Sequence, residues 1–231
     1  MSYAMTIVAA CVMTLSCASC ARSFLAAVKA GDHARAFWFK GTAALSFLAL
    51  GLLGAVDCSR PAIAWRVAAG LLMGLVGDQL LALRFLRPER HDVLFVAGAV
   101  SFAIGHGLYI WALLSLAPGS LPLALLLTAL LVAASLLYLR KKRFDAGPLQ
   151  VCAYVYIAVV ALMGSTAAAV AIRSMSPGAA LFALGGLSFI VSDNVLCVFS
   201  FGADRRFRLN VIVHITYYAA QVLIGWSLFL I

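Results

Sequence analysis

Eight long apolar stretches dominate this chain of 231 residues and limit what it can fold into. A helix needs about 20 apolar residues to cross the hydrocarbon core of a bilayer. Stretches of that kind run over residues 3–21, 37–56, 63–83, 93–116, 121–139, 149–172, 179–201 and 209–231. Hydrophobic residues make up 65% of the chain and charged residues only 11%, which excludes an ordinary soluble domain. The sequence therefore predicts an all-α, polytopic membrane protein with eight transmembrane helices in one bundle, forming one domain over residues 1–231.

The positive charges predict the orientation of these spans. Of the 17 Lys and Arg residues, all but Arg60, Arg66 and Arg173 lie in or beside the loops after the first, third, fifth and seventh spans. Short loops rich in Lys and Arg stay in the cytoplasm, so both termini should face outward. The net charge of +9 therefore sets topology and does not indicate a nucleic-acid partner. The N-terminal stretch has no basic region and is long enough to span, so we expect no cleaved signal peptide. These features fit a bacterial inner membrane.

Two acidic residues lie inside apolar spans, where a charge is costly. Asp78 belongs to GLVGDQLL in the third span, and Asp193 belongs to FIVSDNVL in the seventh. Both spans run in the same direction, and both acids lie just past the middle, within roughly 10 Å of the midplane at 1.5 Å per residue. An acid inside a membrane span indicates a functional site. We therefore expect the two carboxylates to line one cavity in the cytoplasmic half of the membrane.

The fourth span carries polar and small residues on one helix face. Gly98 and Gly105 lie seven residues apart, and Phe102, His106 and Tyr109 follow at steps of four and three. Small residues allow close helix contact, which predicts that His106 and Tyr109 lie at a helix interface. Two interpretations of His106 stay open: it lines the cavity of the two acids, or it is bonded to a backbone carbonyl.

The eighth span carries a second polar stripe, His214, Tyr217, Tyr218 and Gln221. His214 and Tyr217 lie near the predicted cytoplasmic end, where aromatic side chains commonly mark the membrane interface. Tyr154 and Tyr156 of the sixth span fit the same interfacial belt. Gln221 is deeper and needs a hydrogen-bond partner.

The six cysteines indicate neither a disulfide framework nor a metal site. Five of them lie within apolar spans, and Cys17 and Cys20 have the CxxC spacing without a second pair nearby. We interpret these two as small buried residues. The sequence predicts no metal and no cofactor.

Four short motifs, in order and on separate predicted helices, resemble the lysoplasmalogenase or YhhN-like family of integral membrane proteins. They are Gly77-Asp78 with Leu81; Phe95, Gly98, Phe102, Gly105, His106 and Tyr109; Phe189 with Ser192-Asp193; and Tyr217-Tyr218 with Gln221. The resemblance implies eight membrane helices. It also implies hydrolysis of the vinyl ether bond of lysoplasmalogens, releasing a fatty aldehyde and glycerophosphoethanolamine or glycerophosphocholine. The implied partners are a lysophospholipid substrate and the bilayer, and the oligomeric state stays open.

The two acids suit this chemistry. Cleaving a vinyl ether requires protonation of carbon and produces an oxocarbenium ion, so a proton donor and an anion are both needed. Glycosidases use paired carboxylates for a similar cation. We therefore expect Asp78 and Asp193 to be catalytic, one as general acid and the other as the anion that also activates water. His106, Tyr109, Ser192, Tyr218 and Gln221 are candidate supporting or substrate-binding residues.

Three alternatives stay open. Gly74-Leu-Val-Gly77-Asp78 is similar to the GxGD motif of intramembrane aspartyl proteases, but here the second acid comes later and follows Ser192. A metal-dependent lipid hydrolase would combine the two aspartates with His106 and His214. A proton-coupled transporter would also need buried acids, although no internal repeat is evident.

Overall fold

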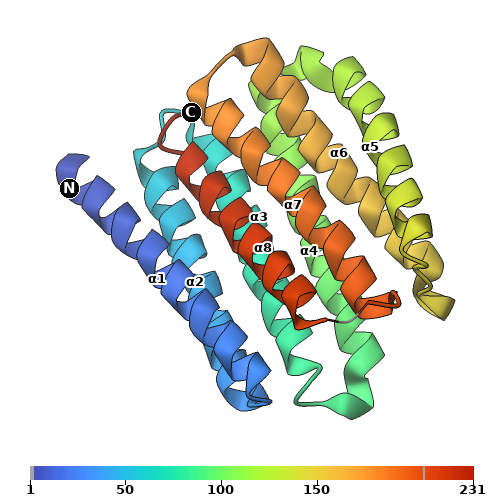
Figure 1. The fold of residues 1–231 in the computed structure, drawn as a ribbon. Coiled ribbons are helices and arrows are strands. Elements are labelled where there is room, and N and C mark those ends of the chain that lie inside the picture. The colour runs from blue at the N-terminus through green and yellow to red at the C-terminus, as the bar shows by residue number, and fades with distance from the viewer. Residues whose placement is uncertain (1–2, 205) are drawn as a thin grey trace.

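The computed structural model describes residues 3–204 and 206–231, and long helices account for nearly all of them. The helices are α1 (Tyr3–Lys29), α2 (His33–Asp57), α3 (Pro61–Leu83), α4 (His91–Leu116), α5 (Leu121–Lys141), α6 (Gln150–Ser174), α7 (Pro177–Phe201) and α8 (Phe207–Ser227). All eight are long and apolar enough to cross a membrane, and no strand occurs within these residues. The predicted eight-helix bundle is confirmed (Figure 1).

The helix ends differ from the predicted spans because polar residues extend the helices beyond the apolar core. α1 continues to Lys29, eight residues past the predicted end, whereas α8 stops at Ser227. α2 begins where the Asp32 side chain accepts a hydrogen bond from the Arg35 backbone amide at 3.0 Å. Proline occupies the first turn of α3 and α7, where its missing N–H leaves no helical hydrogen bond unmade. Short 3₁₀ turns at Pro88–Arg90, Pro118–Ser120 and Gly147–Leu149 mark three of the predicted breaks.

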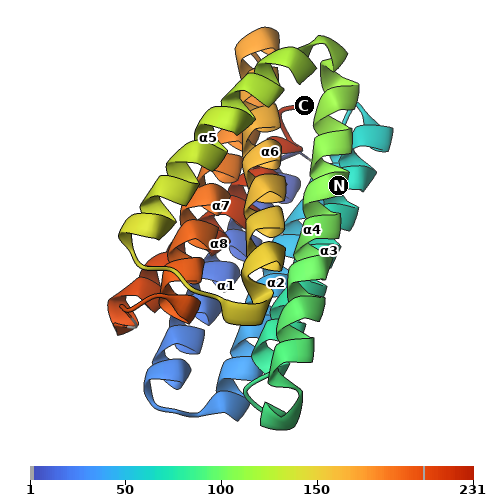
Figure 2. The same ribbon diagram turned by 90° about the vertical axis from the view of Figure 1, so that its right-hand side faces the viewer.

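Packing places some helices at the centre and others at the edge. Consecutive helices pack on each other from α1 to α4 and from α5 to α8, and contacts of α8 with α2 and α3, and of α4 with α6, join the two sets. α1 packs mainly on α2, and α5 packs mainly on α6 at the opposite edge (Figures 1 and 2). The polar residues predicted from sequence therefore come from the more central helices, α3, α4, α7 and α8.

The predicted close contact at the fourth span is confirmed between α3 and α4. A Cβ atom at Gly105 would lie 3.0 Å from the backbone oxygen of Gly70, and one at Gly98 would lie 2.9 Å from the Leu81 side chain. Glycine at these two positions lets the helix axes approach, which brings the α4 side chains within reach of the α3 acid.

The loops after α1, α3, α5 and α7 all lie at one end of the bundle, and both termini lie toward the other end (Figure 1). This arrangement agrees with the alternation that the basic loops predict. We refer below to the end carrying these loops as the basic end.

Candidate active site

A cavity of about 230 Å³ lies among the helices toward the basic end, and both intramembrane acids line it. Asp78 reaches it from α3 and is 1% exposed, and Asp193 reaches it from α7 and is 4% exposed. The expectation that the two carboxylates share one cavity is therefore met. Phe102, Phe189 and Leu196 form part of the wall near them.

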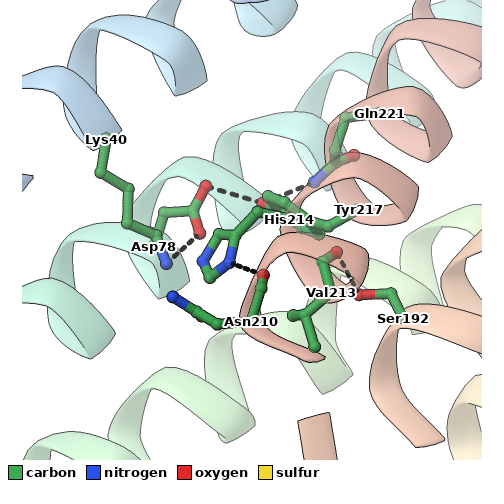
Figure 3. Close-up of polar contacts among 8 residues, drawn as sticks. All are labelled: Lys40, Asp78, Ser192, Asn210, Val213, His214, Tyr217 and Gln221. Atoms are coloured by element: carbon green, nitrogen blue, oxygen red, sulfur yellow. Dashed lines mark hydrogen bonds and ion pairs between the residues drawn. The ribbon is translucent and has the colours of Figure 1, made fainter. Parts of the chain in front are cut away.

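Asp78 is held by a cation and a phenol (Figure 3). The Lys40 ammonium of α2 lies 3.1 Å from Oδ1, and the Tyr217 hydroxyl of α8 donates to Oδ2 at 2.8 Å. Lys40 is only 7% exposed, so this ion pair is shielded from solvent. A buried carboxylate with a cation and a hydrogen-bond donor is stabilised as the anion.

A chain of hydrogen bonds extends from Asp78 toward the centre of the bundle. The Tyr217 hydroxyl accepts from Gln221 Nε2 at 3.0 Å, and the Tyr109 hydroxyl donates to Gln221 Oε1 at 3.2 Å. Gln221 thus has the hydrogen-bond partner that we expected, and it has two: Tyr217 and Tyr109. The interpretation of Tyr217 as an interfacial belt residue is wrong, because its hydroxyl is buried and directed at Asp78. This chain links α4 and α8 to α3 and fixes the rotamer of the Asp78 carboxylate.

Asp193 has a different environment. The Tyr156 hydroxyl of α6 donates to its Oδ2 at 2.9 Å, and among the described residues no Lys, Arg or His forms an ion pair with it. The belt interpretation of Tyr156 is therefore also wrong; Tyr154, which is 42% exposed, still fits it. The two acids share a cavity but differ in charge environment, since only Asp78 has a cationic partner.

The remaining predicted site residues are buried, but they hold different positions. Ser192 lines the cavity, and its hydroxyl donates to the Val213 backbone oxygen at 3.1 Å, which ties α7 to α8. Tyr218 packs against the Tyr217 ring at 5.0 Å, and its hydroxyl has no hydrogen-bond partner within the described chain. Ser192 and Tyr218 thus support the helices that carry Asp193 and Tyr217.

His106 lies behind the cavity wall and does not line the cavity. Its ring is 4.8 Å from the Phe189 ring and 6.1 Å from the Tyr156 ring. Neither ring nitrogen has a hydrogen-bond partner in the described part of the chain, so neither of the two open interpretations, a cavity residue or a bond to a backbone carbonyl, is met there. The structure places His106 against Tyr156, the donor to Asp193, and not against either acid.

We expected His214 to lie at the membrane interface, but it is buried in the cavity wall. Its Nδ1 lies 2.8 Å from the backbone oxygen of Asn210, which can only accept, so Nδ1 carries the proton (Figure 3). Asn210, Arg84 and His33 also line this part of the cavity, nearer the basic end.

Sequence reasoning missed three partners of the acids: Lys40, Tyr156 and Tyr217, although Tyr217 belongs to one of the family motifs. Lys40 was grouped with the basic loop residues, although it lies a full two turns inside α2, in the apolar run FWFKGTAAL. Lys40 in α2 and Asp78 in α3 lie at similar depths in the membrane, and this match could have predicted their ion pair from the sequence. Tyr156 gave no comparable signal, because its orientation relative to Tyr154 depends on how α6 packs.

No metal-binding cluster is formed by the described residues: no three His, Cys, Asp or Glu side chains lie close enough to hold an ion. All six cysteines have free thiols. The structure does not bring together the donor set that the metal-dependent alternative requires.

Comparison with known protein families identifies the family of this chain. A sequence model of the YhhN family matches residues 35–228, which include all of the cavity residues discussed here except His33. No curated protein and no solved structure matched the chain.

Proposed function

The chain belongs to the YhhN family, the family of lysoplasmalogenases, and on this premise we propose that it hydrolyses the vinyl ether bond of a lysoplasmalogen. One observation supports the proposal above all: two buried carboxylates face the same cavity with different partners. The products would be a fatty aldehyde and a glycerophospho-alcohol carrying the headgroup.

The reaction needs two groups with opposite protonation states. A proton adds to the β-carbon of the vinyl ether, and the π electrons and oxygen lone pair stabilise the resulting oxocarbenium ion. Water attacks the cationic carbon and loses a proton, and the hemiacetal then breaks into aldehyde and alcohol. The enzyme must supply an acid at the β-carbon and an anion near the cation.

We assign the acid to Asp193. Without a cationic partner, a buried carboxyl group is more stable neutral than charged. The Tyr156 hydroxyl donates to Oδ2, so Oδ1 is free to carry the transferable proton. Tyr156 thereby positions the proton donor.

We assign the anion to Asp78. Lys40 and Tyr217 hold its carboxylate in place, and no reorganisation is needed when the oxocarbenium ion forms. The same carboxylate is suited to orient the attacking water and accept its proton. The chain Tyr109–Gln221–Tyr217 keeps this geometry fixed between turnovers.

Arg84 is a candidate ligand for the substrate phosphate. It lines the cavity near the basic end, and among the described residues no carboxylate forms an ion pair with it. Its guanidinium packs on the rings of Phe85 and Phe95 at 4.7 and 5.0 Å. A guanidinium held by two aromatic rings and free of a carboxylate partner suits the bidentate recognition of a phosphate. With the basic loops in the cytoplasm, the headgroup would reach the site from the cytoplasmic face of a bacterial inner membrane.

A panel of lysolipids tests the proposed reaction. The lipids share a headgroup and chain length and differ only at the first linkage, which is a vinyl ether, an alkyl ether or an ester. Purified protein in detergent should release aldehyde from the vinyl ether alone. Hydrolysis of the ester instead would overturn the proposed protonation of carbon. Absence of any turnover, with intact binding, would favour a transport role.

The Asp78→Asn and Asp193→Asn variants test the pairing. Each should abolish aldehyde release while leaving folded protein in the membrane, because each removes one of two required protonation states. Tyr154→Phe is a matched control on a lipid-facing side chain. Near-normal turnover of either Asn variant would break the pairing.

A further inference from the structure

A second cavity, of about 300 Å³, lies between α4, α6 and α7 in the half of the bundle near the basic end. Apolar side chains form most of it, including Ala99 and Ala103 of α4 and Ala153 of α6. Val100 and Val155 at its edge are 52% and 59% exposed. In a chain that spans a bilayer, these exposed residues face hydrocarbon. We call this cavity the lateral groove; Figure 2 shows the face of the bundle formed by α4 and α6.

The lateral groove adjoins the active-site cavity. Five residues line both: Leu81, Phe102, Tyr156, Asp193 and Leu196. Asp78, by contrast, lines only the active-site cavity. The proposed proton donor therefore lies at the junction of the apolar lateral groove and the more polar active-site cavity, which reaches Arg84 toward the basic end.

Resting on the proposed function, we propose that the lateral groove binds the single hydrocarbon chain of the substrate, with the first linkage held at Asp193 and Tyr156. The chain reaches the groove sideways from the membrane, without crossing water. The glycerol and phosphate then occupy the active-site cavity toward Arg84.

This placement agrees with the order of atoms in the substrate. The β-carbon of the vinyl ether belongs to the hydrocarbon chain, whereas the ether oxygen begins the glycerol unit. A chain in the groove places the β-carbon on the side of Asp193. The cationic carbon and the attacking water then lie toward Asp78, inside the polar cavity.

The same arrangement explains selection of lipids with one chain. The groove has a volume of about 300 Å³, at the lower end of the range of ligand-binding cavities, roughly 300–1,000 Å³, which suits one chain better than two. A second chain on the neighbouring glycerol carbon would have to enter the polar cavity, beside the Lys40–Asp78 ion pair. Hydrocarbon there would occupy the space proposed for the glycerol and phosphate and would offer these charged groups no polar contact. The groove thus determines specificity for lysolipids over two-chain lipids.

A bulky side chain in the groove provides the first test. Ala103→Trp fills the groove, whereas the neighbouring Ile104 is 52% exposed and lines neither cavity, so Ile104→Trp is the matched control. Ala103→Trp should lower kcat/KM for a long-chain lysoplasmalogen by about tenfold or more, the size of effect expected for a blocked apolar pocket. A short-chain analogue should be much less affected. An equal loss for both chain lengths, with Ile104→Trp normal, would overturn the proposal.

A photolabel on the unmodified protein tests the groove without relying on catalysis or on the folding of a variant. The probe is an alkyl ether lysophospholipid with a diazirine at the end of its chain, which the proposed chemistry does not cleave. Mass spectrometry should locate the label on α4 and α6 at the groove, and excess unlabelled alkyl lysolipid should suppress it. Two-chain phospholipid should not compete.

The outcomes separate this inference from the proposed function. Competable labelling of the groove in a protein that does not hydrolyse vinyl ethers would retain the lipid site and overturn the reaction. Hydrolysis with competable labelling elsewhere, such as on α1 or α2, would retain the reaction and overturn the groove.

Discussion

The ion pair between Lys40 and Asp78 gives the sharpest prediction for a single side chain. At a separation of 3.1 Å and an effective dielectric constant of about 20, the attraction is about 5 kcal/mol. Lys40→Met keeps the side-chain length and removes the charge. The Asp78 carboxylate then remains buried without its cation, and loss of one partner of a buried pair costs about 3–5 kcal/mol. We expect Tm in detergent to fall by roughly 10 °C and aldehyde release to be lost.

A double variant separates stability from catalysis. Lys40→Met combined with Asp78→Asn removes both charges, and such replacements are often neutral for stability. The double variant should therefore recover most of the lost Tm and remain inactive, because the anion is gone. Thermal unfolding followed by intrinsic fluorescence, with aldehyde release measured on the same preparations, provides both readouts. Lys29→Met, an exposed lysine at the end of α1, is the control.

Two results would refute this reasoning. If Lys40→Met retained both its Tm and its activity, the ion pair would not stabilise the site. If the double variant were as unstable as the single variant, the cost would come from lost packing of the lysine chain and not from the unpaired carboxylate.

Three further predictions concern other parts of the site. Tyr156→Phe removes the donor to Asp193 and should lower kcat about fivefold with little change in KM, the effect of one net hydrogen bond of about 1 kcal/mol. A rise in KM with kcat unchanged would contradict a positioning role. Arg84→Gln should raise KM for a phosphate-bearing lysolipid about tenfold or more and leave kcat nearly unchanged, whereas Arg87→Gln, outside the active-site cavity, should not. Prolonged dialysis against a chelator should leave turnover intact, and recovery of lost turnover on adding Zn²⁺ would revive the metal-dependent alternative.

The bundle itself was predictable from sequence because hydrophobicity and length decide whether a helix spans a membrane. Residues 121–139 and 179–201 needed no tertiary information to be identified as spans, and the structure confirms helices there. The helix ends were less predictable, because apolarity says little about how far a helix continues into the polar region. α1 shows this, with its extension to Lys29.

The acids were predictable for a related reason: a carboxylate in a membrane span is costly, so Asp78 and Asp193 stood out in the sequence. Their partners did not. Tyr217 and Tyr156 are tyrosines near the ends of their spans, as interfacial aromatic residues are. Only the rotation of α8 and α6 about their axes directs their hydroxyls at the acids. Helix rotation depends on packing with neighbours, which a hydropathy pattern does not contain.

The central claim is that Asp193 protonates the β-carbon of a vinyl ether. Turnover of a lysoplasmalogen in D₂O tests it directly, because the transferred deuteron stays on carbon. We expect the aldehyde from early time points, reduced at once to the alcohol, to carry one deuterium at C2 in a single configuration, because a fixed acid delivers it to one face of the double bond; an authentic unlabelled aldehyde incubated with the same enzyme should acquire none over that time. Deuterium in both configurations at C2 would contradict the claim, because the β-carbon would then have gained its proton in solution from a released enol and not from Asp193.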